Sequence, residues 1–215
     1  MYSKHDFIEF MQGEGVLRFG EFVTKSGRLS PYFVNTGLYS TGSAAQTLGE
    51  YYAAAITEKI GDDFDALFGP AYKGISLAAL TAEALWRVYG KNYTFFYNRK
   101  EAKDHGEGGN FVGKLPEAGS RVLIVEDVVT AGTAVRETLP LLQAQGYRVE
   151  HMIVSVDRAE RGQSDKSAKQ ELKDTYGITL SSILTARDLY DYLLEKGERE
   201  KAEKMKAYMD RYCVG

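Results

Sequence analysis

The sequence offers little material for disulfides, metal clusters or membrane spans. Its 215 residues include one cysteine, Cys213, and three histidines, so it can form no intrachain disulfide and no cysteine-based metal cluster. Its apolar runs are all shorter than a bilayer span, and its amphipathic, acidic N-terminus lacks the apolar core of a signal peptide. A formal net charge of −3 gives no basic field for nucleic acid. We therefore expect a cytoplasmic protein that binds neither membranes nor nucleic acids.

What the sequence does contain is an alternation of strand-like and helix-like segments. Short apolar strands are expected at 66–68, 93–97, 122–125, 149–156 and 178–184. Helical patterns lie between most of these strands, which predicts an α/β fold with a parallel-sheet core flanked by helices. The length fits one domain with a sizeable core. Pro140 should break or kink the helix expected at 133–145.

Three polar loops follow strands of the predicted sheet, at 69–74, 99–110 and 126–133. Ligands of parallel sheets bind beyond the carboxyl ends of the strands, so all three loops should open toward one crevice. In the third loop, Glu126 and Asp127 directly follow the apolar run 122–125, and small or hydroxyl-bearing residues then lead into a helix. Carboxylates accept hydrogen bonds from a sugar diol, while N–H groups at a helix start favour an anion. This combination predicts a binding site for a phosphorylated sugar.

Residues 121–134, RVLIVEDVVTAGTA, closely resemble the phosphoribosyl pyrophosphate (PRPP) motif of type I phosphoribosyltransferases. Three more segments, 19–33, 69–74 and 99–109, resemble orotate phosphoribosyltransferases in the order of that family. The sequence is therefore identified as a member of the orotate phosphoribosyltransferases. The resemblance implies the type I phosphoribosyltransferase fold, with a small N-terminal hood built mainly from 1–40 and a flexible lid at 99–110. It also implies transfer of ribose 5-phosphate from PRPP to orotate in pyrimidine biosynthesis, giving orotidine 5′-monophosphate and pyrophosphate.

The resemblance also implies which side chains and main-chain groups bind PRPP. They come from the hood, the loop at 69–74, the lid and the motif itself: Lys25, Tyr72, Lys73, Arg99, Lys100, Lys103, His105, Glu126, Asp127, Val128, Val129, Thr130, Ala131, Gly132, Thr133 and Ala134. Catalytic contributions are implied for Lys73, Lys103, His105 and Asp127. Mg²⁺ is the implied cofactor, carried by PRPP without a direct protein ligand and reached from Asp127 through water. The loop at 69–74 is expected to contain a non-proline cis peptide, as it often does in this class.

For orotate, the resemblance implies contacts from Lys25, Phe33, Val34, Thr130 and Arg158. A guanidinium can hold a carboxylate with two parallel hydrogen bonds, which is the kind of role that the family gives to Arg158. Many relatives carry two aromatic residues where this sequence has Phe33 and Val34. Ring stacking is therefore expected from Phe33 alone, and a main-chain contact from Val34. Cys213 is expected to lie at a frayed end without a role.

By the same resemblance, the lid implies an obligate homodimer with shared active sites. In the family, Lys100 contacts PRPP in its own subunit, whereas Arg99, Lys103 and His105 reach the site of the partner. Two other functions stay open. A purine-salvage phosphoribosyltransferase would keep the PRPP motif with a different hood, against which the segment 19–34 argues. A PRPP-responsive regulator would typically add a DNA-binding domain and lose the lid residues that are present here.

Overall fold

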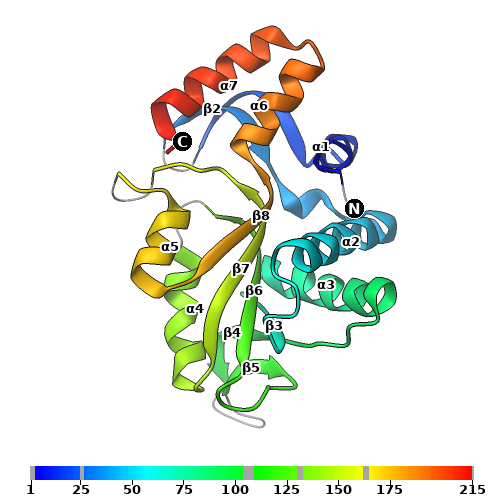
Figure 1. Ribbon diagram of the computed structural model, residues 1–215, viewed down its shortest axis with the longest axis vertical. Helices are drawn as coiled ribbons and strands as arrows, with labels where there is room; N and C mark the ends of the chain where they lie inside the picture. The colour runs from blue at the N-terminus through cyan, green and yellow to red at the C-terminus, as the bar shows by residue number, and fades with distance from the viewer. Residues whose placement is uncertain (1–2, 25–26, 104–108, 130–132, 162–164, 215) are drawn as a thin grey trace.

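The computed structural model describes residues 3–24, 27–103, 109–129, 133–161 and 165–214. Its centre is a six-stranded sheet in the order β5-β4-β3-β6-β7-β8. The strands are β3 (Ala66–Gly69), β4 (Thr94–Lys103), β5 (Gly109–Gly113), β6 (Arg121–Val129), β7 (Arg148–Asp157) and β8 (Thr179–Thr185). All neighbouring strands are parallel except β4 and β5, which are antiparallel. Helices flank this sheet on both faces (Figure 1), so the predicted α/β architecture is confirmed.

Two apolar cores lie on opposite faces of the sheet because successive side chains of a strand point to opposite sides. In β6, Leu123 and Val125 belong to the core under α2 (Gly42–Lys59) and α3 (Lys73–Tyr89). Val122 and Ile124 belong to the core under α4 (Thr133–Ala144) and α5 (Ala168–Tyr176). A strand buried on both faces needs apolar residues at every position, which the run 122–125 supplies. This packing fixes the strand from which the paired acids project.

A cap at the carboxyl ends of the strands is built from the N-terminal and C-terminal segments of the chain (Figure 1). It consists of α1 (Lys4–Gly13), the antiparallel hairpin of β1 (Leu17–Val23) and β2 (Leu29–Val34), and the helices α6 (Ala186–Glu195) and α7 (Arg199–Tyr212). A short 3-10 helix, η1 (Thr36–Leu38), follows β2 and completes the cap. Helix α7 packs on β2, and α1 packs on α6. Between α6 and α7, Gly197 adopts a left-handed backbone conformation (φ 73°) that glycine accommodates without steric cost.

Two segments near the predicted crevice are more regular than the sequence indicates. Strand β6 does not end before the paired acids but continues through them to Val129, which is in register with Asp157 of β7. The segment 99–110, expected to be a loop, is partly strand, because β4 extends to Lys103 and pairs there with Gly109 of β5. Pairing through backbone groups extends both strands regardless of their polar side chains. Residues 104–108, between these strands, lie outside the described part of the chain.

The expectation for Cys213 is wrong, and so is the expected break of the helix at Pro140. Helix α4 runs from Thr133 to Ala144 and includes the exposed Pro140, because Leu139 and Leu142 are buried in the core on either side of it. Cys213 is not frayed but buried, and its thiol donates to the carbonyl oxygen of Arg158 at 3.3 Å.

Among the described helices, none combines the length and the apolar character that crossing a bilayer requires.

Candidate active site

The strand order creates a topological switch point between β3 and β6. From β3 the chain passes to β4 on one side and later returns to β6 on the other. Ligands of open α/β sheets bind outside the carboxyl ends of the strands at such a point. The last residues in register between the two strands are Phe68 and Ile124. Glu126 and Asp127 lie just beyond this pair, at the same edge of the sheet as the turn that follows β3.

The Asp127 carboxylate is held by groups from three parts of the fold. Its Oδ2 accepts hydrogen bonds from Lys73 Nζ, at the start of α3, and from Thr36 Oγ1 in η1, each at 2.8 Å. Its Oδ1 accepts from the backbone N–H of Val128 at 2.8 Å. Burial opposes ionisation, but the bonds from Lys73 and Thr36 outweigh it, so the pKa of Asp127 is lowered. Asp127 is therefore charged at neutral pH and joined to both α3 and the cap.

Glu126 has the opposite protonation preference. Its side chain is buried, and its Oε1 accepts the backbone N–H of Asp127 at 2.9 Å. Burial, together with the negative charge of Asp127, raises the pKa of Glu126 to about 8. At neutral pH the pair therefore carries one carboxylate and one protonated carboxyl group. The carboxylate can accept a hydrogen bond and the protonated carboxyl group beside it can donate one. Together they suit two adjacent hydroxyl groups of a sugar.

Two buried hydroxyl groups hold the backbone of the paired acids. Tyr52 of α2 donates to the carbonyl oxygen of Glu126 at 2.7 Å, and Ser155 of β7 donates to that of Asp127 at 2.6 Å. Both side chains are fully buried, where a hydroxyl group without a partner would destabilise the fold. Neither residue was predicted from the sequence. Ser155 carries a weak signal as the one hydroxyl in the apolar run 152–156, whereas Tyr52 carries none.

The turn after β3 depends on glycine. A Cβ atom on Gly69 would lie 2.0 Å from the carbonyl oxygen of Gly74, so no larger residue allows this close approach of the backbone. The peptide bond between Ala71 and Tyr72 is cis, as expected. The N–H of Ala71 donates to Asn98 Oδ1 at 2.9 Å, which connects the turn to β4. The Tyr72 side chain is 72% exposed and thus accessible to a ligand.

The rest of the predicted PRPP site is described only in part. Outside the described residues lie Lys25, His105, Thr130, Ala131 and Gly132, and the side chains of Lys103, Thr133 and Ala134. In the described part of the chain, the buried Nε of Arg99 has no hydrogen-bond partner. Lys100 forms a 3.8 Å ion pair with Glu137 of α4. Val128 and Val129 end strand β6, and the Val129 side chain lies in the core beneath α4.

Of the residues predicted for orotate, Phe33 and Val34 lie in strand β2 of the cap. Phe33 of β2 is 36% exposed, and its ring stacks on Phe22 with centroids 5.4 Å apart. The guanidinium carbon of Arg18 lies 5.8 Å from the centre of the Phe33 ring. Val34 packs against the core beneath the cap. Phe33 therefore offers an accessible aromatic surface on this strand, and Val34 does not.

Arg158 follows β7 and is buried in a hydrogen-bond network. Its Nε donates to Glu160 Oε1 at 2.5 Å. Its Nη2 donates to Ser30 Oγ at 3.0 Å and to the Tyr208 hydroxyl at 2.8 Å. The guanidinium carbon lies 4.4 Å from the centre of the Tyr32 ring. Among the described residues, no hydrogen-bond partner of Nη1 is present, so Nη1 is available to a ligand. Two parallel hydrogen bonds to a carboxylate would need a second nitrogen of Arg158, which would have to leave its partner in this network.

Glu160 balances two cations in this network. Besides Arg158, it pairs with Arg28 of the cap, whose Nη1 lies 2.8 Å from Glu160 Oε2. Burial alone would raise the pKa of Glu160, but the charge of Arg158 and the hydrogen bond from Tyr208 outweigh it, so the pKa is lowered. Two guanidinium groups and one carboxylate leave an excess of one positive charge. An excess positive charge in a largely buried network favours the binding of an anionic ligand.

Comparison with known proteins gives consistent matches. The family described as "Phosphoribosyl transferase domain" matches residues 38–183. The orotate phosphoribosyltransferase of Clostridium acetobutylicum is 50% identical over 213 residues, which cover 97% of this chain and 95% of that protein. The orotate phosphoribosyltransferase of Escherichia coli (strain SE11) is 49% identical over 212 residues, which cover 98% of each chain. A crystal structure of the Francisella tularensis orotate phosphoribosyltransferase matches with a TM-score of 0.88 and 36% identity, covering 97% of this chain and 100% of that one.

Glu126→Gln should flatten the dependence of stability on pH. The raised pKa means that the folded protein keeps a proton that the unfolded chain loses near the ordinary value of 4.5. The free energy of unfolding should therefore fall as the pH rises from 4.5 to about 8, and level off above. The contribution of Glu126 to this slope is up to about 1.4 kcal/mol per pH unit. Urea unfolding at about pH 5, 6.5 and 8 measures it.

The exposed Glu117 provides the control for this experiment. Glu117→Gln should leave the slope unchanged, whereas Glu126→Gln should remove the contribution of the buried carboxyl group. Equal slopes for Glu126→Gln and the unsubstituted protein would contradict a protonated Glu126 at neutral pH.

Proposed function

The chain belongs to the orotate phosphoribosyltransferase family, and on this premise we propose that it transfers the ribose 5-phosphate group of PRPP to orotate. The products would be orotidine 5′-monophosphate and pyrophosphate, in pyrimidine biosynthesis. The observation that carries this proposal is the Asp127 carboxylate at the switch point, bound by Lys73 and Thr36. In this arrangement, an acid that can bind the ribose lies beside a cation that can bind the pyrophosphate. Both lie next to a residue of the cap. We expect the reaction to take place in the cytoplasm.

PRPP binding would exchange the partners of Asp127. Lys73 and Asp127 form an ion pair at 2.8 Å. Each also has a complementary group in PRPP, since pyrophosphate oxygens suit Lys73 and ribose hydroxyl groups suit Asp127. Thr36 would keep its bond to Oδ2 and so maintain the orientation of the carboxylate. Glu126, protonated at neutral pH, would donate to the adjacent hydroxyl group, and the 5′-phosphate would bind at residues 128–134.

The bond that breaks joins ribose C1′ to pyrophosphate. As it lengthens, positive charge develops on the ribose ring and negative charge on the leaving group. Asp127 would stabilise the first, and Lys73 with the lid residues Lys100, Lys103 and His105 would stabilise the second. An orotate nitrogen then forms the new bond to C1′ from the opposite face, which inverts the anomeric carbon. The paired acids thus act by binding and electrostatics rather than by proton transfer.

Mg²⁺ is the expected cofactor, and the paired acids fit a cation that arrives with PRPP. Mg²⁺ prefers oxygen ligands and often binds through one or two carboxylates together with substrate phosphates. Here one acid is protonated at neutral pH, and the other already accepts three hydrogen bonds, so the pair does not form a dedicated metal cage. When bound, Mg²⁺ would neutralise charge on the pyrophosphate, and Asp127 would reach it through water.

Orotate would bind between the switch point and the cap. The exposed ring of Phe33 suits a flat pyrimidine, and the main chain of Val34 would border it. The positively charged network around Arg158 suits the orotate carboxylate. Lys25 and Thr130 complete the predicted contacts. The cap would therefore select the base, while the sheet binds the donor.

We also propose that the protein is a homodimer with shared active sites. The antiparallel strands β4 and β5 support the lid, and β5 is an edge strand of the sheet. An edge position of these two strands supports a lid that acts beyond its own subunit. Arg99, Lys103 and His105 would reach the site of the partner, whereas Lys100 would act in its own subunit.

Orotate consumption tests the proposed reaction. With PRPP and Mg²⁺, orotate absorbance should fall in step with pyrophosphate release, and uracil, hypoxanthine and adenine should give no comparable turnover. Asp127→Asn should lower kcat by about 100-fold or more, because it removes a charge that stabilises the transition state. Glu117→Gln should leave kcat unchanged. No loss of orotate would overturn the proposal. Turnover of a purine base would indicate purine salvage, and PRPP binding without turnover would indicate a regulator.

Mixing two inactive variants tests the shared sites. Lys103→Ala should remove a group that acts in the partner's site, and Thr130→Ala one that acts in its own. In a heterodimer of the two, one site carries both defects and the other carries none. Co-refolded mixtures should therefore regain about a quarter of the activity of the unsubstituted protein, because about half of the dimers are mixed. Activity no greater than the average of the separately refolded variants would argue against sharing.

A further inference from the structure

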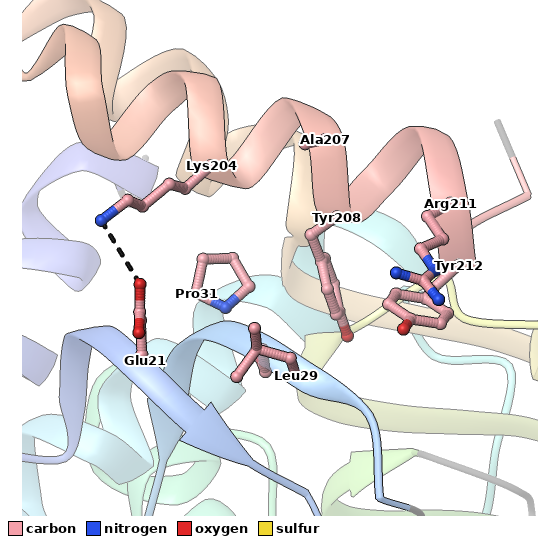
Figure 2. A pocket seen from close by; sticks show the side chains of 9 residues that line it. Glu21, Leu29, Pro31, Lys204, Ala207, Tyr208, Arg211 and Tyr212 are labelled. Atoms are coloured by element: carbon pink, nitrogen blue, oxygen red, sulfur yellow. Dashed lines mark ion pairs between the residues drawn. The ribbon is translucent and has the colours of Figure 1, made fainter.

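Tyr208 connects the C-terminal helix to the network around Arg158. Figure 2 shows Tyr208 projecting from α7 toward the β1–β2 hairpin, beside Leu29 and Pro31. These residues line an open groove of about 230 Å³ between α7 and the hairpin. The Tyr208 hydroxyl donates to Glu160 Oε1 and accepts from Arg158 Nη2 at 2.8 Å. Because Tyr208 is only 4% exposed, both bonds are shielded from water.

These contacts determine the orientation of the Arg158 guanidinium. Nε donates to Glu160, and the two hydrogens of Nη2 are directed to Tyr208 and Ser30. A planar guanidinium that is held at both of these nitrogens has no freedom to rotate in its plane. The ring of Tyr32, 4.4 Å from the guanidinium carbon, restricts its tilt. Nη1 is thereby held at the side of the group that faces away from these partners.

The C-terminal segment is itself fastened to the loop that carries Arg158. The N–H of Val214 donates to the carbonyl oxygen of Ala159 at 2.9 Å, and the N–H of Arg161 donates to that of Tyr212 at 2.8 Å. The Cys213 thiol donates to the carbonyl oxygen of Arg158. Helix α7 therefore has a fixed position relative to the carboxyl end of β7. Its contribution to the network is built into the fold and is not a chance contact of a free terminus.

We propose that Tyr208 and Glu160 are positioning residues for orotate, which hold Arg158 so that Nη1 meets the orotate carboxylate. This inference rests on the proposed function, because it takes orotate as the ligand of Arg158. It adds that the C-terminal helix, which is remote from the PRPP motif, determines the affinity for the acceptor. PRPP binds instead at the switch point, where Asp127 and Lys73 make no contact with this network.

The variant Tyr208→Phe distinguishes a role of Tyr208 in positioning Arg158 from a merely structural role. It removes the hydroxyl group but keeps the ring that lines the groove. The KM for orotate should rise about tenfold, as expected for the loss of hydrogen bonds to charged groups, while the KM for PRPP should stay within about twofold. Inhibition by the carboxamide analogue of orotate should change less than twofold, since that analogue lacks the charge that Arg158 recognises.

Two more variants complete the design. Tyr212→Phe is the matched control, because Tyr212 lines the same groove and its hydroxyl has no hydrogen-bond partner among the described residues. It should leave both KM values unchanged. Ser30→Ala, on the other side of Nη2, should reproduce the effect of Tyr208→Phe and serves as the test if that variant does not fold. Parallel changes in both KM values, or none in orotate KM, would overturn the inference. An unsubstituted protein without orotate turnover would instead overturn the proposed function.

Discussion

The candidate site at the switch point depends on the Asp127 carboxylate and the two side chains that hold it. Lys73 and Thr36 lie 54 and 91 residues away in sequence, and they come from the helix after β3 and from the cap. A buried carboxylate is unstable without partners, so these contacts join the sheet, α3 and the cap into one site. Thr36 has a particular consequence, since it fixes the cap relative to the acid that would bind the ribose. The proposed donor and acceptor sites would therefore lie next to each other.

Buried charges of opposite sign lie at two separate places in the candidate site. The paired acids carry one negative charge, because burial keeps Glu126 protonated beside the ionised Asp127. The network around Arg158 carries an excess positive charge, because Arg28 and Arg158 share the single carboxylate of Glu160. Charges act strongly where water is excluded, so each place selects its ligand group. The first suits hydroxyl groups such as those of a sugar, and the second suits a carboxylate.

The parts of this arrangement that could be predicted from the sequence are those with local signals. The run 122–125 followed by two acids specifies a buried strand that carries carboxylates to the crevice, and the glycines at 69 and 74 specify a close turn. The partners of these groups have no local signal. Thr36, Tyr52, Ser155, Glu160 and Tyr208 are ordinary polar residues whose roles arise only when distant elements pack together. Strands β4 and β6 are longer than expected because backbone pairing continues through polar side chains.

When PRPP binds, Lys73 and Asp127 would part from each other and bind groups of PRPP instead. A crystal structure of the protein with PRPP and Mg²⁺ would show this exchange. We expect Asp127 Oδ2 to keep its bond to Thr36 and to accept one from a ribose hydroxyl group, while Lys73 Nζ lies at the pyrophosphate. PRPP bound with the Lys73–Asp127 distance still at 2.8 Å, or bound away from the switch point between β3 and β6, would rule the exchange out.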